Sequence, residues 1–158
     1  MKTIVLGIGN PILQDDGVGI HIANKLKKTI NYPNVKIDEA LTGGMNLLDL
    51  IIGYDKAILI DAVNIRNEKQ GEVKRFLLKD LTSVHSDNPH DVSLAEAIEL
   101  AKNLGEKRIP KEIILIGIVL KKIPYEFGEN LSQNIAAAIP KAVDMTLKEI
   151  KKIVNCSS

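Results

Sequence analysis

The chain has 158 residues, 45% hydrophobic but only 3% aromatic, which predicts a single domain over residues 1–158 with a mainly aliphatic core. Its 21 basic and 20 acidic residues nearly cancel, and its longest apolar run, residues 113–120, is well short of the roughly 20 residues that a transmembrane helix needs. Neither nucleic acid nor a membrane is therefore an expected partner. The only cysteine, Cys156, leaves no internal disulfide partner, and without a signal-peptide pattern the expected location is cytoplasmic.

The hydrophobic pattern predicts alternating strands and helices through the first half of the chain. A continuous apolar run such as that before Gly7 is typical of a strand buried on both faces, whereas apolar residues spaced three or four apart are typical of a helix. The elements predicted in this half are strands at 2–8, 35–40 and 56–61 and helices at 17–29 and 45–52.

A further strand is predicted at 72–78, and the pattern indicates that it runs antiparallel to the others. The link to it from the strand at 56–61 is about ten residues long and has no helical periodicity. A parallel crossover usually needs a dozen residues or more, normally with a helix. The alternation of apolar and charged residues in this strand favours a position at the edge of the sheet.

The last elements are a helix that begins at Pro89, a strand at 112–119 and a helix at 131–154 that Pro140 is expected to bend. Asn88 is a suitable N-cap for the first of these helices, with Pro89 at its first position. Together the elements predict an α/β fold, a three-layer α/β/α sandwich around a five-stranded, mostly parallel sheet with one antiparallel strand.

The stretch GIGNPILQDDGVG, which begins at Gly7, joins the first strand to the first helix. It lies at the carboxyl end of a strand, where open α/β sheets bind their ligands. Gly7 and Gly9 match two glycines of the dinucleotide fingerprint, but Ile12 stands at the third position and the acidic pair would repel a pyrophosphate. Another interpretation is that Asp15 or Asp16 caps the helix, which leaves the other carboxylate unexplained.

Three polar residues are predicted to converge at this edge: Asp16, Asp61 and His90. Asp61 ends a buried strand, although a turn or capping role is equally compatible with its position. His90 is the second residue of a helix, where the dipole disfavours the imidazolium and leaves a neutral ring able to bind a metal; a solvated first-turn histidine is the alternative. Two carboxylates and an imidazole suit Ni, Zn, Mn or Fe without choosing among them.

Four segments resemble those of the hydrogenase maturation endopeptidases and follow the order of that family. GIGNPILQDDGVG resembles their opening motif, ILIDA with Asp61 their strand-end aspartate, and NPHDVSL with His90 their histidine segment. The residues Gly43-Gly44 before Met45 are similar to their glycine-rich loop. Common signatures of zinc, thiol and serine hydrolases do not occur in the sequence.

Two departures from the family pattern are small. Asn88 replaces the usual hydroxyl residue, which changes only the cap. Asp16 stands where some members carry the longer Glu, so the site must close up slightly.

The resemblance implies an endopeptidase, of a kind grouped with the aspartic proteases. Its members remove the C-terminal extension of the large-subunit precursor of a nickel–iron hydrogenase after nickel insertion. The resemblance also implies that Asp16, Asp61 and His90 recognise this nickel, so the metal belongs to the substrate and no permanent cofactor is expected. Either carboxylate could activate water, or nickel could polarise the scissile carbonyl; the residues leave both mechanisms open.

The resemblance also suggests candidate residues for loops that contact the substrate: Asn10, Thr42, Gly43 and Gly44. It also leaves two competing functions, a non-catalytic nickel-binding accessory protein and a small-molecule-binding α/β domain. The loop from Lys79 to Pro89 is predicted to run along the side of the sheet and to place His90 at the cleft. Ten extended residues span roughly 35 Å, which is enough to cross a sheet.

Overall fold

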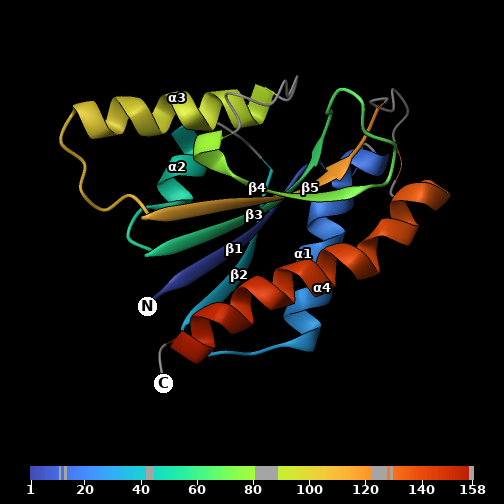
Figure 1. Cartoon of the computed structure of the whole chain (residues 1–158), viewed down its shortest axis with the longest axis horizontal. Coiled ribbons are helices and arrows are strands. Elements are labelled where there is room, and N and C mark those ends of the chain that lie inside the picture. Colours follow the sequence, from blue (N-terminus) through green and yellow to red (C-terminus); the bar gives the residue numbers. More distant parts are fainter. Residues whose placement is uncertain are drawn as a thin grey trace.

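The computed structural model describes residues 1–10, 12, 14–41, 45–80, 89–121, 128 and 130–156, without the side chains of 45, 89–93 and 156. A five-stranded sheet lies at its centre, in the order β2-β1-β3-β5-β4 (Figure 1). Its strands are β1 (Thr3–Ile8), β2 (Val35–Ala40), β3 (Lys56–Val63), β4 (Val73–Leu77) and β5 (Glu112–Val119). All neighbours are parallel except β4 and β5, so the predicted antiparallel edge strand is confirmed.

Helices cover both faces of the sheet, α2 and α3 on one side and α1 and α4 on the other (Figure 1). They are α1 (Val18–Thr29), α2 (Met45–Ile51), α3 (Pro89–Asn103) and α4 (Gln133–Cys156), with two short 3-10 turns, η1 (Gln14–Gly17) and η2 (Leu78–Asp80). This is the predicted three-layer sandwich. Within the described ranges, no helix combines the length and apolar character needed to cross a membrane.

The central strands contribute to two cores because successive side chains point to opposite faces. Leu6 and Leu59 belong to the core under α2 and α3, whereas the adjacent Val5 and Ile58 belong to the core under α1 and α4. Every residue of β1 and β3 is buried, as expected for strands covered on both faces.

Several boundaries differ by one or two residues from those predicted. β3 does not end at Asp61 but continues to Val63, because Ala62 and Val63 are apolar and pair with β5. The N-cap of α1 is Gly17, without a side-chain hydrogen bond, so the predicted capping of this helix by an aspartate is wrong. The two aspartates instead lie in η1. α4 contains Pro140 within a single helix, and its start at Gln133 is two residues later than predicted.

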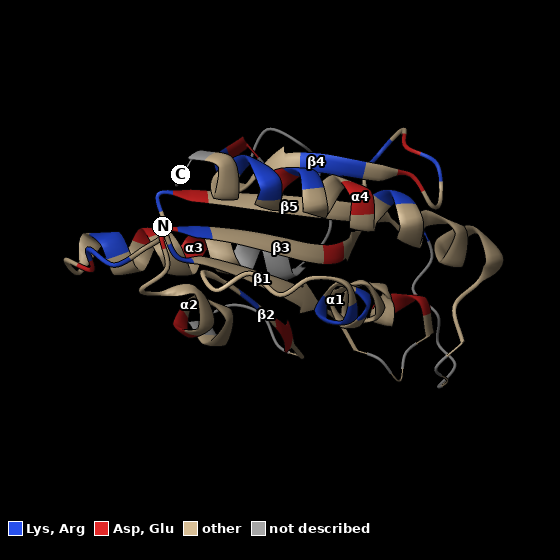
Figure 2. Ribbon diagram, turned by 90° about the horizontal axis from the view of Figure 1, so that it is seen from below, with Lys and Arg blue, Asp and Glu red and all other residues tan. Residues whose placement is uncertain are grey.

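An ion-pair network fastens α4 to the sheet at the edge where β3 and β5 begin. Glu149 of α4 is 3% exposed, and its carboxylate accepts hydrogen bonds from Arg75 at 2.5 Å and from Lys56 at 3.4 Å. Lys56 also pairs with Glu112, and Lys152 pairs with Glu149. Figure 2 shows α4 lying across β4 and β5, with charged segments on both layers. Burial alone raises the pKa of Glu149, but the hydrogen bonds from Arg75 and Lys152 outweigh it, so this pKa lies below its ordinary value.

Candidate functional site

The carboxyl ends of β1 and β3 lie at the point where the strand order of the sheet reverses. β1 continues through α1 to β2 on one side, whereas β3 has β5 on its other side. Open α/β sheets bind ligands in the crevice at such a switch point. Asp61 lies near the end of β3, and η1, which carries Asp16, follows β1 and packs against β3. The structure therefore brings the segments of both predicted carboxylates to one edge.

Glycines allow η1 and the start of α1 to lie directly on the strands. A Cβ atom added at Gly7 would come within 2.3 Å of the Gly19 carbonyl oxygen, and one at Gly19 within 2.4 Å of the Ile60 carbonyl oxygen. Gly9, with φ +151°, has the Asp16 carbonyl oxygen 2.1 Å from the place of a Cβ. These close contacts between parts of the chain explain why glycines are needed at Gly7 and Gly9, so the Gly-x-Gly pattern does not require a bound phosphate.

Asn10 holds one oxygen of the Asp16 carboxylate. The backbone N–H of Asn10 donates to Asp16 Oδ2 at 3.2 Å, and the side-chain Oδ1 of Asn10 accepts from the N–H of Ile12 at 3.2 Å. The second contact is an Asx turn, in which a side chain replaces a backbone acceptor. Asn10, predicted as a substrate-loop residue, thus organises the loop around the half-buried Asp16.

Asp61 is a buried carboxylate inside an apolar strand, with only 1% of its surface exposed. Leu59 and Val63 lie in the core under α2 and α3, and alternate residues of a strand share a face, so Asp61 points toward that side of the sheet. Removing a carboxylate from water costs stability, and natural proteins accept such a cost mainly at functional sites.

The described side chains leave the third predicted ligand untested. His90 is the second residue of α3, and Leu94, one helical turn later, is buried in the same core as Leu59 and Val63. The start of α3 therefore covers the face toward which Asp61 points. The side chain of His90 is outside the described part of the structure. Among the side chains that are described, no group of three or more His, Cys, Asp or Glu residues could hold a metal ion.

Other predictions also lie outside the described residues. These are the loop candidates Thr42, Gly43 and Gly44 and the crossing of the sheet's side by residues 81–88. The end of β4 and the beginning of α3, which that loop joins, are described.

The sequence did not distinguish the roles of the two adjacent aspartates. Asp15 is 7% exposed and its Oδ1 accepts a hydrogen bond from the backbone N–H of Ser132 at 2.6 Å. Asp16 contacts Asn10 instead and is half-buried. The roles of Asp15 and Asp16 differ because of a long-range contact: Ser132, which bonds to Asp15, is 117 residues away along the chain.

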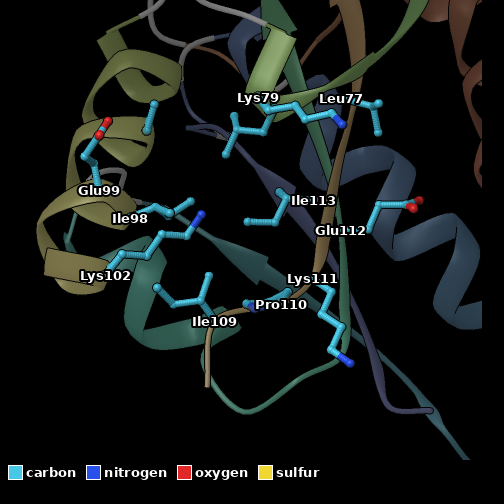
Figure 3. Close-up of a pocket in the computed structure, with 12 residues that line it drawn as sticks. Leu77, Lys79, Ile98, Glu99, Lys102, Ile109, Pro110, Lys111, Glu112 and Ile113 are labelled. Atoms are coloured by element: carbon cyan, nitrogen blue, oxygen red, sulfur yellow. The ribbon is translucent and has the colours of Figure 1, made fainter. Parts of the chain in front are cut away.

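A pocket of about 500 Å³ lies between β4, α3 and the start of β5 (Figure 3). Leu77, Ile98 and Ile113 provide apolar lining, and Lys79 and Lys102 also line it. It includes the first residues of β5, whereas the β5 partner of Asp61 is five positions further along. At roughly 3.3 Å per residue this places Glu112, which lines the pocket, about 16 Å along the sheet from Asp61. The pocket is therefore not part of the candidate site.

Comparisons with known proteins all point to one kind of protein. A family model described as hydrogenase maturation protease matches residues 20–149. The chain is 26% identical to the hydrogenase 2 maturation protease of Escherichia coli (96% of this chain, 92% of the relative). It is 32% identical to a putative hydrogenase maturation protease of Methanocaldococcus jannaschii (94% and 96%).

Solved structures give the same description. The hydrogenase maturating endopeptidase HybD from E. coli is similar with a TM-score of 0.78 and 25% identity, covering 96% of this chain and 93% of that one. The nickel–iron hydrogenase maturation protease HybD from Thermococcus kodakarensis is similar with a TM-score of 0.69 and 28% identity, covering 94% and 98%.

Proposed function

Since the chain belongs to the hydrogenase maturation protease family, we propose that this protease removes the C-terminal extension of a nickel–iron hydrogenase large-subunit precursor after nickel insertion. The observation that carries the proposal is the meeting of two acidic segments at the switch point of the sheet. Asp61 is buried in β3, and the turn that carries Asp16 packs against the same strand. The proposed partner is the precursor, in the cytoplasm.

In this proposal nickel is part of the substrate, and the protein recognises it by binding it with Asp16, Asp61 and His90. Carboxylate and imidazole are suitable ligands for a divalent first-row metal. Burial of Asp61 strengthens its attraction to a cation because charges interact more strongly away from bulk water. A precursor without nickel lacks the ion that these side chains need, so it binds poorly and is not cut.

Cleavage adds water to the carbonyl carbon of the scissile amide, breaks the C–N bond and transfers a proton to the leaving amine. A carboxylate, Asp16 or Asp61, can take the proton from the attacking water as a general base. Nickel brought by the substrate can instead polarise the carbonyl. Both routes require the carboxylates at this edge, so both predict the same loss on substitution.

The test is the processing of a nickel-loaded precursor, followed as its shortening on a denaturing gel. Asp16→Ala, Asp61→Asn and His90→Ala should each lower the rate on the order of 10²-fold or more, with an unchanged circular dichroism spectrum. The matched controls are His21→Ala and Asp144→Ala, which remove a half-buried histidine of α1 and an exposed aspartate of α4. A site variant that processes at the wild-type rate contradicts the assignment of that residue. Binding of the precursor without shortening would support the accessory-protein alternative.

A further inference from the structure

We propose that Asp15 is a positioning residue for the cleavage reaction: it joins the turn that carries Asp16 to the start of α4. This inference rests on the proposed function of Asp16. Asp15 is 93% buried, since 7% of its surface is exposed, and its Oδ1 accepts the N–H of Ser132 at 2.6 Å. A short hydrogen bond from a backbone N–H to a buried carboxylate is among the stronger hydrogen bonds in proteins.

The location of Ser132 strengthens this bond. Ser132 directly precedes Gln133, the first residue of α4, and its carbonyl oxygen accepts the N–H of Ala136 at 2.8 Å. Ser132 therefore begins the first turn of the longest helix in the described fold. The first N–H groups of a helix have no acceptor within it, and its dipole makes this end positive. The carboxylate of Asp15 satisfies one of these donors and is attracted to the helix end.

A second connection holds the same turn at its first residue. The N–H of Gln14 donates to the carbonyl oxygen of Gly128 at 2.9 Å, and the N–H of Gly128 donates to that of Ile12 at 2.8 Å. Gln14 has φ +48°, an uncommon conformation for a residue with a side chain. The turn is thus held at Gln14 by Gly128 and at Asp15 by Ser132, both of which precede α4 in the chain.

The opposite side of the turn rests on the strands. The close approach of Gly9 to the Asp16 carbonyl oxygen and the bond from Asn10 N–H to Asp16 Oδ2 attach it to the end of β1. Asp16 therefore lies between two anchors, β1 on one side and the start of α4 on the other. Without the Asp15 carboxylate, the bonds that remain between the described residues of this loop and the segment before α4 are those of Gln14 and Ile12 with Gly128. A displacement of about 1 Å at a reacting group can cost 10²-fold in rate.

The first test compares kcat/KM for nickel-loaded precursor among three variants. Asp15→Ala should lower it about 10- to 100-fold. Asp15→Asn keeps an oxygen acceptor for Ser132 N–H and should recover to within about threefold of the wild type. The control Glu149→Gln weakens the attachment of α4 at its other end and should stay within about threefold of the wild type.

The second readout is amide hydrogen exchange at Asn10 and Ser132, which does not depend on activity. Both amides should exchange faster in Asp15→Ala and at the wild-type rate in Asp15→Asn and Glu149→Gln. The proposal is overturned if Asp15→Ala cuts as fast as the wild type, or if Glu149→Gln loses as much activity. It is also overturned if Asp15→Asn stays inactive while Ser132 remains protected, because the charge of Asp15 would then act directly.

Failure of the proposed function gives a different result. In that case the wild-type protein leaves the nickel-loaded precursor uncut, and the positioning role is judged by hydrogen exchange alone. Unchanged exchange at Asn10 in Asp15→Ala would overturn it.

Discussion

At the scale of single residues, Glu149 offers the clearest link between a side chain and stability. It is 3% exposed and bonded to Arg75 and Lys56, so Glu149→Gln leaves the charge of the buried Lys56 with the exposed Glu112 as its remaining acidic partner among the described residues. Loss of such a partner costs about 1–3 kcal/mol, and we expect this fall in the free energy of unfolding at pH 7, measured by urea titration. Lys148→Ala, which removes an exposed ion pair with Asp144, should change it by less than about 0.5 kcal/mol.

The lowered pKa of Glu149 gives this contribution a definite pH dependence. A carboxyl whose pKa is lower in the folded state stabilises the protein above its unfolded pKa, and this stabilisation is lost as pH falls through the folded value. The ordinary pKa of a glutamate carboxyl is 4.5, and the pKa of Glu149 in the folded protein lies below it. The difference between wild type and Glu149→Gln should therefore be full at pH 7 and shrink below pH 4.5. A constant difference down to pH 3 would contradict the assignment.

Residue roles at the site were only partly predictable from the sequence. The acidic pair was recognisable as unusual, but the bond from Ser132 N–H that distinguishes Asp15 from Asp16 joins residues 117 positions apart. Helix capping by one of the pair was the local alternative, and the structure contradicts it because Gly17 occupies the N-cap. Patterns within a few residues cannot show contacts that arise only when distant elements pack.

At the scale of elements, the contact of α1 with β1 and β3 depends on Gly19. Alanine favours a helix over glycine by about 1 kcal/mol, which alone would stabilise α1. A Cβ at this position would meet the carbonyl oxygens of Ile60 and Ile8 at 2.4 Å, however, and such overpacking costs about 1–3 kcal/mol or more. Gly19→Ala should therefore lower the free energy of unfolding, and it should slow processing because η1 directly precedes α1.

Gly105→Ala is the matched comparison for this prediction. Gly105 has φ +91° but nothing within 4 Å of a Cβ, so its substitution measures backbone strain without a clash. It should cost about 1–2 kcal/mol and leave processing unchanged. A Gly19→Ala protein at least as stable as the wild type would show that the close packing is not required.

The elements themselves were largely predictable because each carries its own periodicity. The antiparallel direction of β4 followed from the short link before it, and the structure confirms it. The end of β3 was misplaced because an aspartate within an apolar run resembles a strand terminus, whereas pairing with β5 continues to Val63. A charged residue inside a buried strand contradicts local pattern rules, and such conflicts are typical of functional sites.

At the scale of the whole molecule, the proposed nickel site is shared between protein and substrate. We expect the isolated protein to bind nickel with a Kd weaker than about 1 µM, equivalent to about −8 kcal/mol, because the precursor supplies the remaining ligands. Isothermal calorimetry measures this directly. Nanomolar binding without the precursor would show that a complete site exists in the protein alone.

The proposed recognition of nickel is tested most directly by treating matched precursors, with and without inserted nickel, with the wild-type protein. Intact mass spectrometry records whether the C-terminal extension is removed. We predict that the nickel-loaded precursor loses its extension while the nickel-free precursor keeps its full mass, and that Asp16→Ala leaves both intact. Equal cleavage of the nickel-free precursor would contradict the recognition of nickel by Asp16, Asp61 and His90.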